Sequence, residues 1–87
     1  DLAAALAHAA REGVHVYKAE ASGADVLKEK LARPAVLVLG SEAHGLGKSV
    51  REVPGRSIAI PAFGGAESLN VAAAAAALCM EFARQGR

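Results

Sequence analysis

An unbroken apolar segment constrains this fold more than any other part of the sequence. Ala35-Val36-Leu37-Val38-Leu39 contains no polar residue, and Gly40 follows it directly. A strand that is apolar at every position is typical of a parallel sheet whose two faces are both covered by helices. The segment therefore predicts an α/β fold, in which the rest of the chain must supply further strands and helices.

The remaining sequence supplies these elements in alternation. The predicted helices cover residues 2–12, 25–32 and 69–84, with one short helical turn over 49–53, and the other predicted strands cover 14–17 and 56–60. Gly13 is the predicted C-cap of the first helix, and Ser22-Gly23 is predicted to break the strand before it. Arg33-Pro34 is predicted to stop the second helix, because the residue before a proline disfavours the α region. The expected architecture is a parallel sheet flanked by helices.

The composition allows one small domain with a thin core. Of the 87 residues, 53% are hydrophobic, which is more than a disordered segment contains. Much of this is alanine, and only two Phe, one Tyr and no Trp are available as large core residues. We therefore expect neighbouring chain or a second copy to cover part of the core.

Simple counts exclude several functional classes. The formal net charge is only +1, so the chain has no general basic excess for wrapping nucleic acid. Cys79 is the single cysteine, so we expect no disulfide, no metal site and a reducing compartment, with Cys79 itself in the core. The apolar run over residues 71–80 is too short to span a membrane. The start, Asp1-Leu2-Ala3, has neither a Met nor a basic region, which indicates an excised fragment rather than a signal peptide.

Two glycine-containing loops follow predicted strands. They cover residues 40–47 and 61–68, and each holds one acid, Glu42 or Glu67. In a parallel sheet, ligands bind beyond the carboxyl ends of the strands, and glycine lets backbone groups approach a ligand closely. The two loops therefore predict one shared pocket.

The end of the first loop, Gly45-Leu46-Gly47-Lys48-Ser49, resembles the end of a nucleotide phosphate-binding loop. That motif requires a glycine five positions before its second glycine. Counted back from Gly47, this position is Glu42, whose carboxylate would repel phosphate. A nucleotide-hydrolysing domain is therefore disfavoured.

Two longer motifs carry a resemblance to a known family. Residues 37–46, LVLGSEAHGL, resemble the second signature of the SpoU (TrmH-like) RNA methyltransferases. Residues 60–72, from Ile60-Pro61 to Ser68-Leu69-Asn70-Val71-Ala72, resemble their third signature. The order of the two motifs, the interval between them and the long last helix also match the family.

The resemblance implies a SPOUT-type fold with a C-terminal trefoil knot, a homodimer that uses the last helix, and a cytoplasmic enzyme. It implies S-adenosyl-L-methionine as the cofactor and rRNA or tRNA as the substrate, methylated at a ribose 2′-hydroxyl. By position, the residues implied to hold the cofactor are Leu39, Gly40, Gly45, Ile60, Pro61 and Leu69. The residues implied near the reacting groups are Glu42, Ser68 and Asn70, of which the last two are neutral and orient the reactants.

The first signature of the family, which contains an Asn and an Arg, has no match in this chain. Residues 1–87 are therefore expected to form the C-terminal part of a catalytic domain and to supply its cofactor-binding half, inactive when isolated. The alternative is a non-catalytic module that binds a ligand or dimerises. An upstream segment bearing the first signature would distinguish the enzyme from the module.

Overall fold

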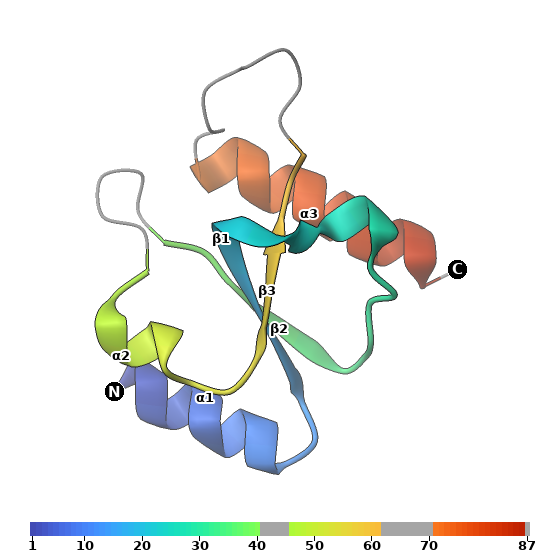
Figure 1. The fold of residues 1–87 in the computed structure, drawn as a ribbon. Helices are drawn as coiled ribbons and strands as arrows, with labels where there is room; N and C mark the ends of the chain where they lie inside the picture. Colours follow the sequence, from blue (N-terminus) through green and yellow to red (C-terminus); the bar gives the residue numbers. More distant parts are fainter. Residues whose placement is uncertain (41–45, 62–70, 87) are drawn as a thin grey trace.

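A parallel three-stranded sheet forms the middle layer of the molecule (Figure 1). The computed structural model describes residues 1–40, 46–61 and 71–86. The strands are β1 (His15–Asp25), β2 (Ala35–Val38) and β3 (Arg56–Ala59), in the spatial order β2-β1-β3. The helices are α1 (Leu2–Arg11), α2 (Lys48–Arg51) and α3 (Val71–Gln85), with one 3-10 turn, η1 (Val26–Lys28). The predicted α/β fold with a parallel sheet flanked by helices is confirmed.

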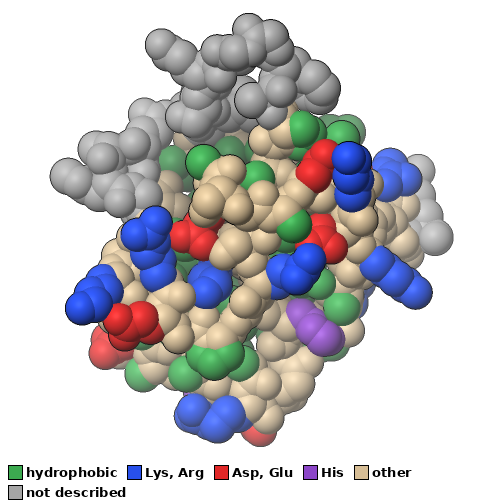
Figure 2. Space-filling model, viewed as in Figure 1, with side chains coloured by type: hydrophobic (Ala, Val, Ile, Leu, Met, Phe, Trp, Pro, Cys, Tyr) green, Lys and Arg blue, Asp and Glu red, His purple; other side chains and the backbone are tan. Residues whose placement is uncertain are grey.

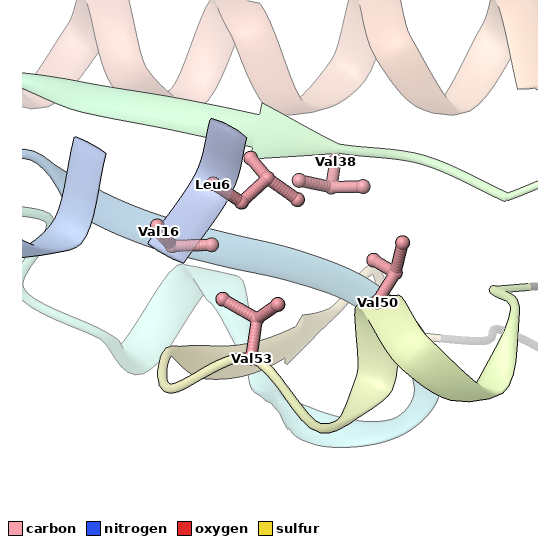
Figure 3. Close-up of a cluster of buried hydrophobic side chains, with 5 residues drawn as sticks. All are labelled: Leu6, Val16, Val38, Val50 and Val53. Atoms are coloured by element: carbon pink, nitrogen blue, oxygen red, sulfur yellow. The ribbon is translucent and has the colours of Figure 1, made fainter. Parts of the chain in front are cut away.

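Helices cover both faces of the sheet, and a separate apolar cluster lies under each face. On one face, α1 and α2 pack over the cluster that we call the α1-side core, drawn in Figure 3: Leu6, Val16, Val38, Val50 and Val53. On the opposite face, α3 packs over the α3-side core: Tyr17, Val26, Ile58 and Leu78. Val16 and Tyr17 are neighbours in β1 and point to opposite faces, as the period of two along a strand requires.

The first helix begins at Leu2, as the sequence predicts, and ends at Arg11, one residue before the predicted end. The Asp1 carboxylate accepts a hydrogen bond from the Ala4 N–H at 2.9 Å and so caps the first turn. Gly13 has a φ of +89°, a left-handed conformation that favours glycine after a helix. This turn leads the chain directly from α1 into the central strand.

The first strand is longer than predicted, and the break predicted at Ser22-Gly23 is wrong. β1 continues to Asp25 and pairs with β3 on both sides of a register shift between Ala19 and Ala24. A Cβ at position 23 would lie 2.6 Å from the backbone of Ile58. Gly23 is therefore needed because it allows the two strands to approach closely, and it does not end the strand.

The helix predicted over residues 25–32 is also wrong, because only η1 forms there. The Asp25 carboxylate accepts a hydrogen bond from the Leu27 N–H at 2.9 Å, which starts a single turn. Val26 is buried in the α3-side core and Leu31 packs against that core, whereas Leu27 is exposed. The apolar residues whose spacing resembles a helix thus attach an irregular segment to the sheet and to α3.

The other predicted elements are confirmed with small shifts at their ends, and α3 is described from Val71 onward. The expectation that Cys79 lies in the core is wrong, since its side chain is exposed. α3 turns Leu78 and Glu81 toward the sheet, so Met80 faces away from it and Cys79 lies at the side of the helix. Among the described residues, no helix has the length and apolar character needed to cross a membrane.

Candidate functional site

β2 and β3 end at the same edge of the sheet, because all three strands are parallel. Leu39 and Gly40 follow β2 at this edge, and Ile60 and Pro61 follow β3 on the other side of β1. Leu39 and Ile60 are half-buried, and both pack against the α3-side core. The structure therefore brings four of the predicted cofactor-binding residues to one edge, and two of them onto a common apolar cluster.

The remaining predicted site residues lie outside the described part of the chain: Glu42, Gly45, Ser68, Leu69 and Asn70. Leu46, the last residue of the second-signature motif, is described and packs against the α1-side core. Leu37, the first residue of that motif, packs against the α3-side core. The motif therefore starts on one face of the sheet and ends on the other.

A buried lysine in β1 holds the short helix α2 in place. Only 6% of Lys18 is exposed, and its Nζ donates hydrogen bonds to the carbonyl oxygens of Arg51 and Val53 at 2.9 and 2.8 Å. These carbonyls lie at the carboxyl end of α2, where a helix leaves such groups without a partner of its own. The ammonium group thus fixes α2 against the sheet, and the carbonyl oxygens compensate for its burial.

Two residues further along β1, Glu20 joins α2 to β3. Its Oε1 accepts a hydrogen bond from the Arg51 Nε at 3.0 Å, and its Oε2 accepts one from the Ser57 hydroxyl. The Ser57 hydroxyl, followed by the Arg51 guanidinium, holds the pKa of the Glu20 carboxyl below its ordinary value. We call Lys18, Glu20, Arg51 and Ser57 the Glu20 network.

Neither Lys18 nor Glu20 is predicted as functional from the sequence, because the predicted strand over residues 14–17 ends before both. A usable signal is their spacing of two and four residues from Val16. If the strand continues, this spacing puts both polar residues on the face that buries Val16. Polar side chains on a covered face require partners, which is the role that Arg51 and Ser57 fill here.

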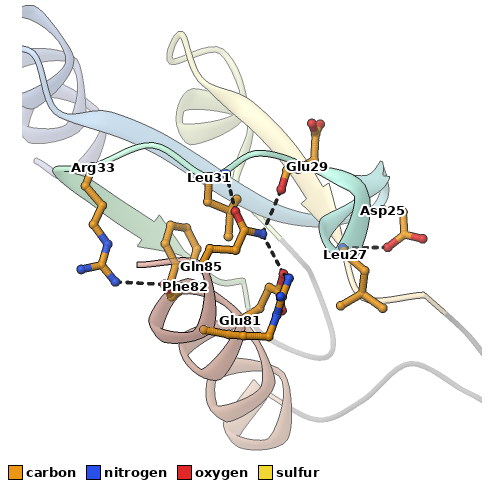
Figure 4. Close-up of polar contacts among 9 residues, drawn as sticks. Asp25, Leu27, Glu29, Leu31, Arg33, Glu81, Phe82 and Gln85 are labelled. Atoms are coloured by element: carbon orange, nitrogen blue, oxygen red, sulfur yellow. Dashed lines mark hydrogen bonds and ion pairs between the residues drawn. The ribbon is translucent and has the colours of Figure 1, made fainter. Parts of the chain in front are cut away.

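On the opposite face, the end of α3 is tied to the irregular segment after η1 (Figure 4). The Gln85 Nε2 donates hydrogen bonds to the Glu29 carbonyl oxygen at 2.9 Å and to the Glu81 carboxylate at 2.7 Å. The Gln85 Oε1 accepts one from the Leu31 N–H at 2.8 Å. One side chain of α3 therefore binds the backbone on both sides of residue 30.

Charge and ring contacts reinforce this end of α3. Arg84 donates two hydrogen bonds to the Glu81 carboxylate, at 2.7 and 2.6 Å. Arg84 first, and Gln85 second, lower the pKa of Glu81 to about 2. The Tyr17 ring meets the Phe82 ring edge-on, with centroids 5.3 Å apart. These contacts attach the end of α3 to the sheet, away from the carboxyl edge.

Two cavities are described, and neither includes a predicted site residue. A groove of about 410 Å³ lies beside the amino end of β2 and is lined by Arg33, Pro34, Ala35, Leu37, Cys79, Phe82 and Ala83. A second, of about 350 Å³, is lined by Ala10, Val14, His15, Val16, Tyr17, Pro54, Gly55 and Arg56. Neither cavity therefore includes the described motif residues at the carboxyl edge.

The surface chemistry of the described residues is mixed. Figure 2 shows Lys and Arg side chains spread over one face with acidic side chains between them, in keeping with the net charge of +1. Within residues 1–40, 46–61 and 71–86, no group of three His, Cys, Asp or Glu side chains could hold a metal ion. At the carboxyl edge, the described residues Leu39 and Ile60 are apolar and half-buried.

Comparison with known proteins identifies relatives along almost the whole chain. The model of the SpoU rRNA methylase family matches residues 1–80. A solved protein from Porphyromonas gingivalis, assigned to the TrmH family of RNA methyltransferases, is 39% identical with a TM-score of 0.90. That match covers 98% of this chain and 36% of the other.

Two further solved structures connect the fold to methyl transfer. The SpoU methyltransferase AviRb from Streptomyces viridochromogenes, solved with the cofactor AdoMet, is 30% identical with a TM-score of 0.80, over 94% of this chain and 32% of the other. A structure that addresses the 2-OH methylation of C/U34 on tRNA is 31% identical with a TM-score of 0.79, over 97% and 57% of the two chains. Curated mycobacterial relatives are uncharacterized tRNA/rRNA methyltransferases, and the chain spans about a quarter of their length. Because the family model matches residues 1–80 of the 87, the chain belongs to the SpoU rRNA methylase family.

Proposed function

We propose that this chain is the cofactor-binding, C-terminal part of an enzyme that methylates a ribose 2′-hydroxyl of rRNA or tRNA with S-adenosyl-L-methionine. One observation carries the proposal: Leu39 and Ile60 leave parallel strands at the same edge and pack on one apolar cluster. An adenosine cofactor needs an apolar slot with a few placed hydrogen bonds. The AdoMet complex of AviRb supports the cofactor, and the relative linked to 2-OH methylation on tRNA supports the acceptor.

In this proposal the backbone of two loops holds the cofactor. The contributing residues are Leu39, Gly40, Gly45, Ile60, Pro61 and Leu69. The bound cofactor supplies a methyl group activated on a sulfonium sulfur. Ser68 and Asn70 orient the ribose hydroxyl toward this methyl group, and Glu42 belongs to the same pocket; fixed orientation lowers the entropic part of the barrier. Removal of the hydroxyl proton is assigned to the first signature, which this chain does not match.

The proposal extends to the assembly. Residues 1–87 form the C-terminal part of a SPOUT domain, with the second signature at 37–46 and the third at 60–72, and the C-terminal stretch forms a trefoil knot. The enzyme is a cytoplasmic homodimer to which α3 contributes. The isolated chain is inactive because it lacks the first signature.

A non-catalytic module that binds a ligand or dimerises is the second candidate. The missing first signature favours it, because the chain then lacks the group that would activate the ribose hydroxyl. The enzyme transfers a methyl group to RNA, whereas the module does not.

Calorimetric titration of S-adenosylhomocysteine, followed by transfer of labelled methyl groups to rRNA and tRNA, tests the proposal in the complete protein. Leu69→Arg is expected to raise the Kd about tenfold or more, because a bulky charge enters an apolar slot. The control Leu2→Arg makes the same change at an exposed position of α1 and is expected to leave the Kd unchanged. Asn70→Ala is expected to lower turnover with little change in the Kd. A complete protein that does not bind contradicts the proposal, and binding without transfer supports the module.

A further inference from the structure

We infer that Glu20 is a positioning residue for the cofactor site. Its carboxylate joins α2, the helix that follows the second-signature motif, to β3, the strand that leads into the third-signature motif. This inference rests on the proposed function. Glu20 belongs to neither signature motif, and its role is to hold the backbone that the motifs provide.

The position of Glu20 in the sheet agrees with this role. β1 pairs with β2 as far as Lys18 and Val38. Glu20 is two residues beyond that pair on β1, and Gly40 is two residues beyond it on β2. Because β1 is the central strand, Glu20 stands beside the carboxyl edge between the strands that lead to Gly40 and Ile60.

The Glu20 carboxylate contacts both elements that flank the proposed site. Arg51 is the last residue of α2, the helix that follows the second-signature motif, and its Nε lies 3.0 Å from the Glu20 Oε1. Ser57 lies in β3, three residues before Ile60, and its hydroxyl donates to the Glu20 Oε2. A single carboxylate therefore links α2 directly to β3.

The charge on Glu20 is maintained by its partners, although little of the side chain is open to water. Its side chain is 16% exposed, and the positive partners are the Arg51 guanidinium and the nearby Lys18 ammonium. Without the charge, Arg51 loses its ionic partner and the connection between α2 and β3 weakens. A cofactor held by backbone groups depends on their preset positions, so its affinity falls when they loosen.

The test compares two glutamates whose ion pairs are almost equally exposed. The side chains of Glu20 and Arg51 are 16% and 62% exposed, and those of Glu29 and Arg56 are 18% and 62% exposed. In the complete protein, Glu20→Gln is expected to raise the Kd of S-adenosylhomocysteine about tenfold. Glu29→Gln is expected to leave the Kd unchanged, because Arg56 is at the amino end of β3. Both variants should lose similar thermal stability, so the difference in Kd isolates positioning from folding.

Ser57 provides a second test that does not depend on the folding of Glu20→Gln. Ser57→Ala is expected to raise the Kd about threefold, and Ser57→Thr, which keeps the hydroxyl, is expected to restore the wild-type value. If the wild-type protein binds S-adenosylhomocysteine and the Glu20 and Ser57 variants bind it with the wild-type Kd, the inference is overturned and the proposed function stands. If wild-type protein does not bind, the proposed function fails and the inference fails with it.

Discussion

The two faces of the sheet differ in which element supplies the side chain that attaches the covering segment. On the α1 side, a lysine of the central strand reaches outward to the backbone carbonyls at the end of α2. On the α3 side, a glutamine of the helix reaches inward to the backbone of Glu29 and Leu31. In both cases a long side chain binds main-chain groups of a segment too short or irregular to satisfy them itself. The central strand β1 therefore positions α2 near the proposed site, whereas on the opposite face α3 positions the irregular segment after η1.

The apolar clusters differ in the same sense. The α1-side core consists of one leucine and four valines, whereas the α3-side core contains Tyr17, Ile58 and Leu78 and is joined by Phe82. Larger side chains remove more apolar surface from water when they are buried. We therefore expect the α3 side to contribute more of the stability through packing, and the α1 side to depend more on Lys18.

The largest expected effect comes from shortening the same side chain on each face. Leu78→Ala is expected to lower the free energy of unfolding by about 2–5 kcal/mol, since Leu78 is only 1% exposed and its removal leaves a cavity. Leu6→Ala, on the α1 side, is expected to lower the free energy of unfolding by only about 2 kcal/mol, the lower limit of that range. Urea unfolding of both variants measures the difference. A larger loss for Leu6→Ala would reverse the comparison between the faces.

Removal of the buried ammonium is expected to have an intermediate effect. Lys18→Met leaves the carbonyl oxygens of Arg51 and Val53 without a donor, at an expected cost of about 1–3 kcal/mol in the free energy of unfolding. Lys30→Met, at an exposed position, is expected to change it by less than about 0.5 kcal/mol. Urea unfolding again provides the measurement. Equal stability of Lys18→Met and wild type would mean that the valines alone hold α2.

The smallest expected effect is a dependence of stability on acid pH. The pKa of Glu81 is lowered from its ordinary value of 4.5 to about 2 in the folded chain. Between these values the unfolded chain binds more protons, so the stabilisation present above 4.5 is lost as the pH falls toward 2. Glu81→Gln is expected to flatten this dependence, and Glu12→Gln, at an exposed position, to leave it unchanged. Unfolding in urea at several acid pH values checks this, and an unaltered slope in Glu81→Gln contradicts it.

Elements that depend on residues within their own span could be predicted from the sequence. The apolar run before Gly40, the Asp1 cap and the Gly13 turn all act locally, so β2 and α1 lie where they are expected. The helix over residues 25–32 could not be excluded in this way. Leu31 is held by Gln85, which is 54 positions later in the chain, and no local pattern reports such a contact.

The candidate site was predictable only in part, for a related reason. The motifs located Leu39 and Ile60 at the carboxyl edge, because apolar strands followed by glycine or proline are visible in the sequence. The Glu20 network was not visible. Lys18 binds carbonyl oxygens 33 and 35 positions later, and a carbonyl oxygen has no sequence signature.

Because Lys18 binds backbone carbonyl oxygens and not side chains, its contact with α2 has a consequence for how α2 can evolve. Every amino acid carries the carbonyl oxygen to which the Lys18 ammonium binds. Substitutions at positions 51 and 53 can therefore accumulate without undoing this attachment, provided that the backbone keeps its path. The bond between Glu20 and Ser57 joins two side chains, so it persists only while position 57 keeps a hydroxyl and position 20 keeps an acceptor. Within one network, a substitution-tolerant anchor thus lies beside a bond that depends on the side chains at both of its positions.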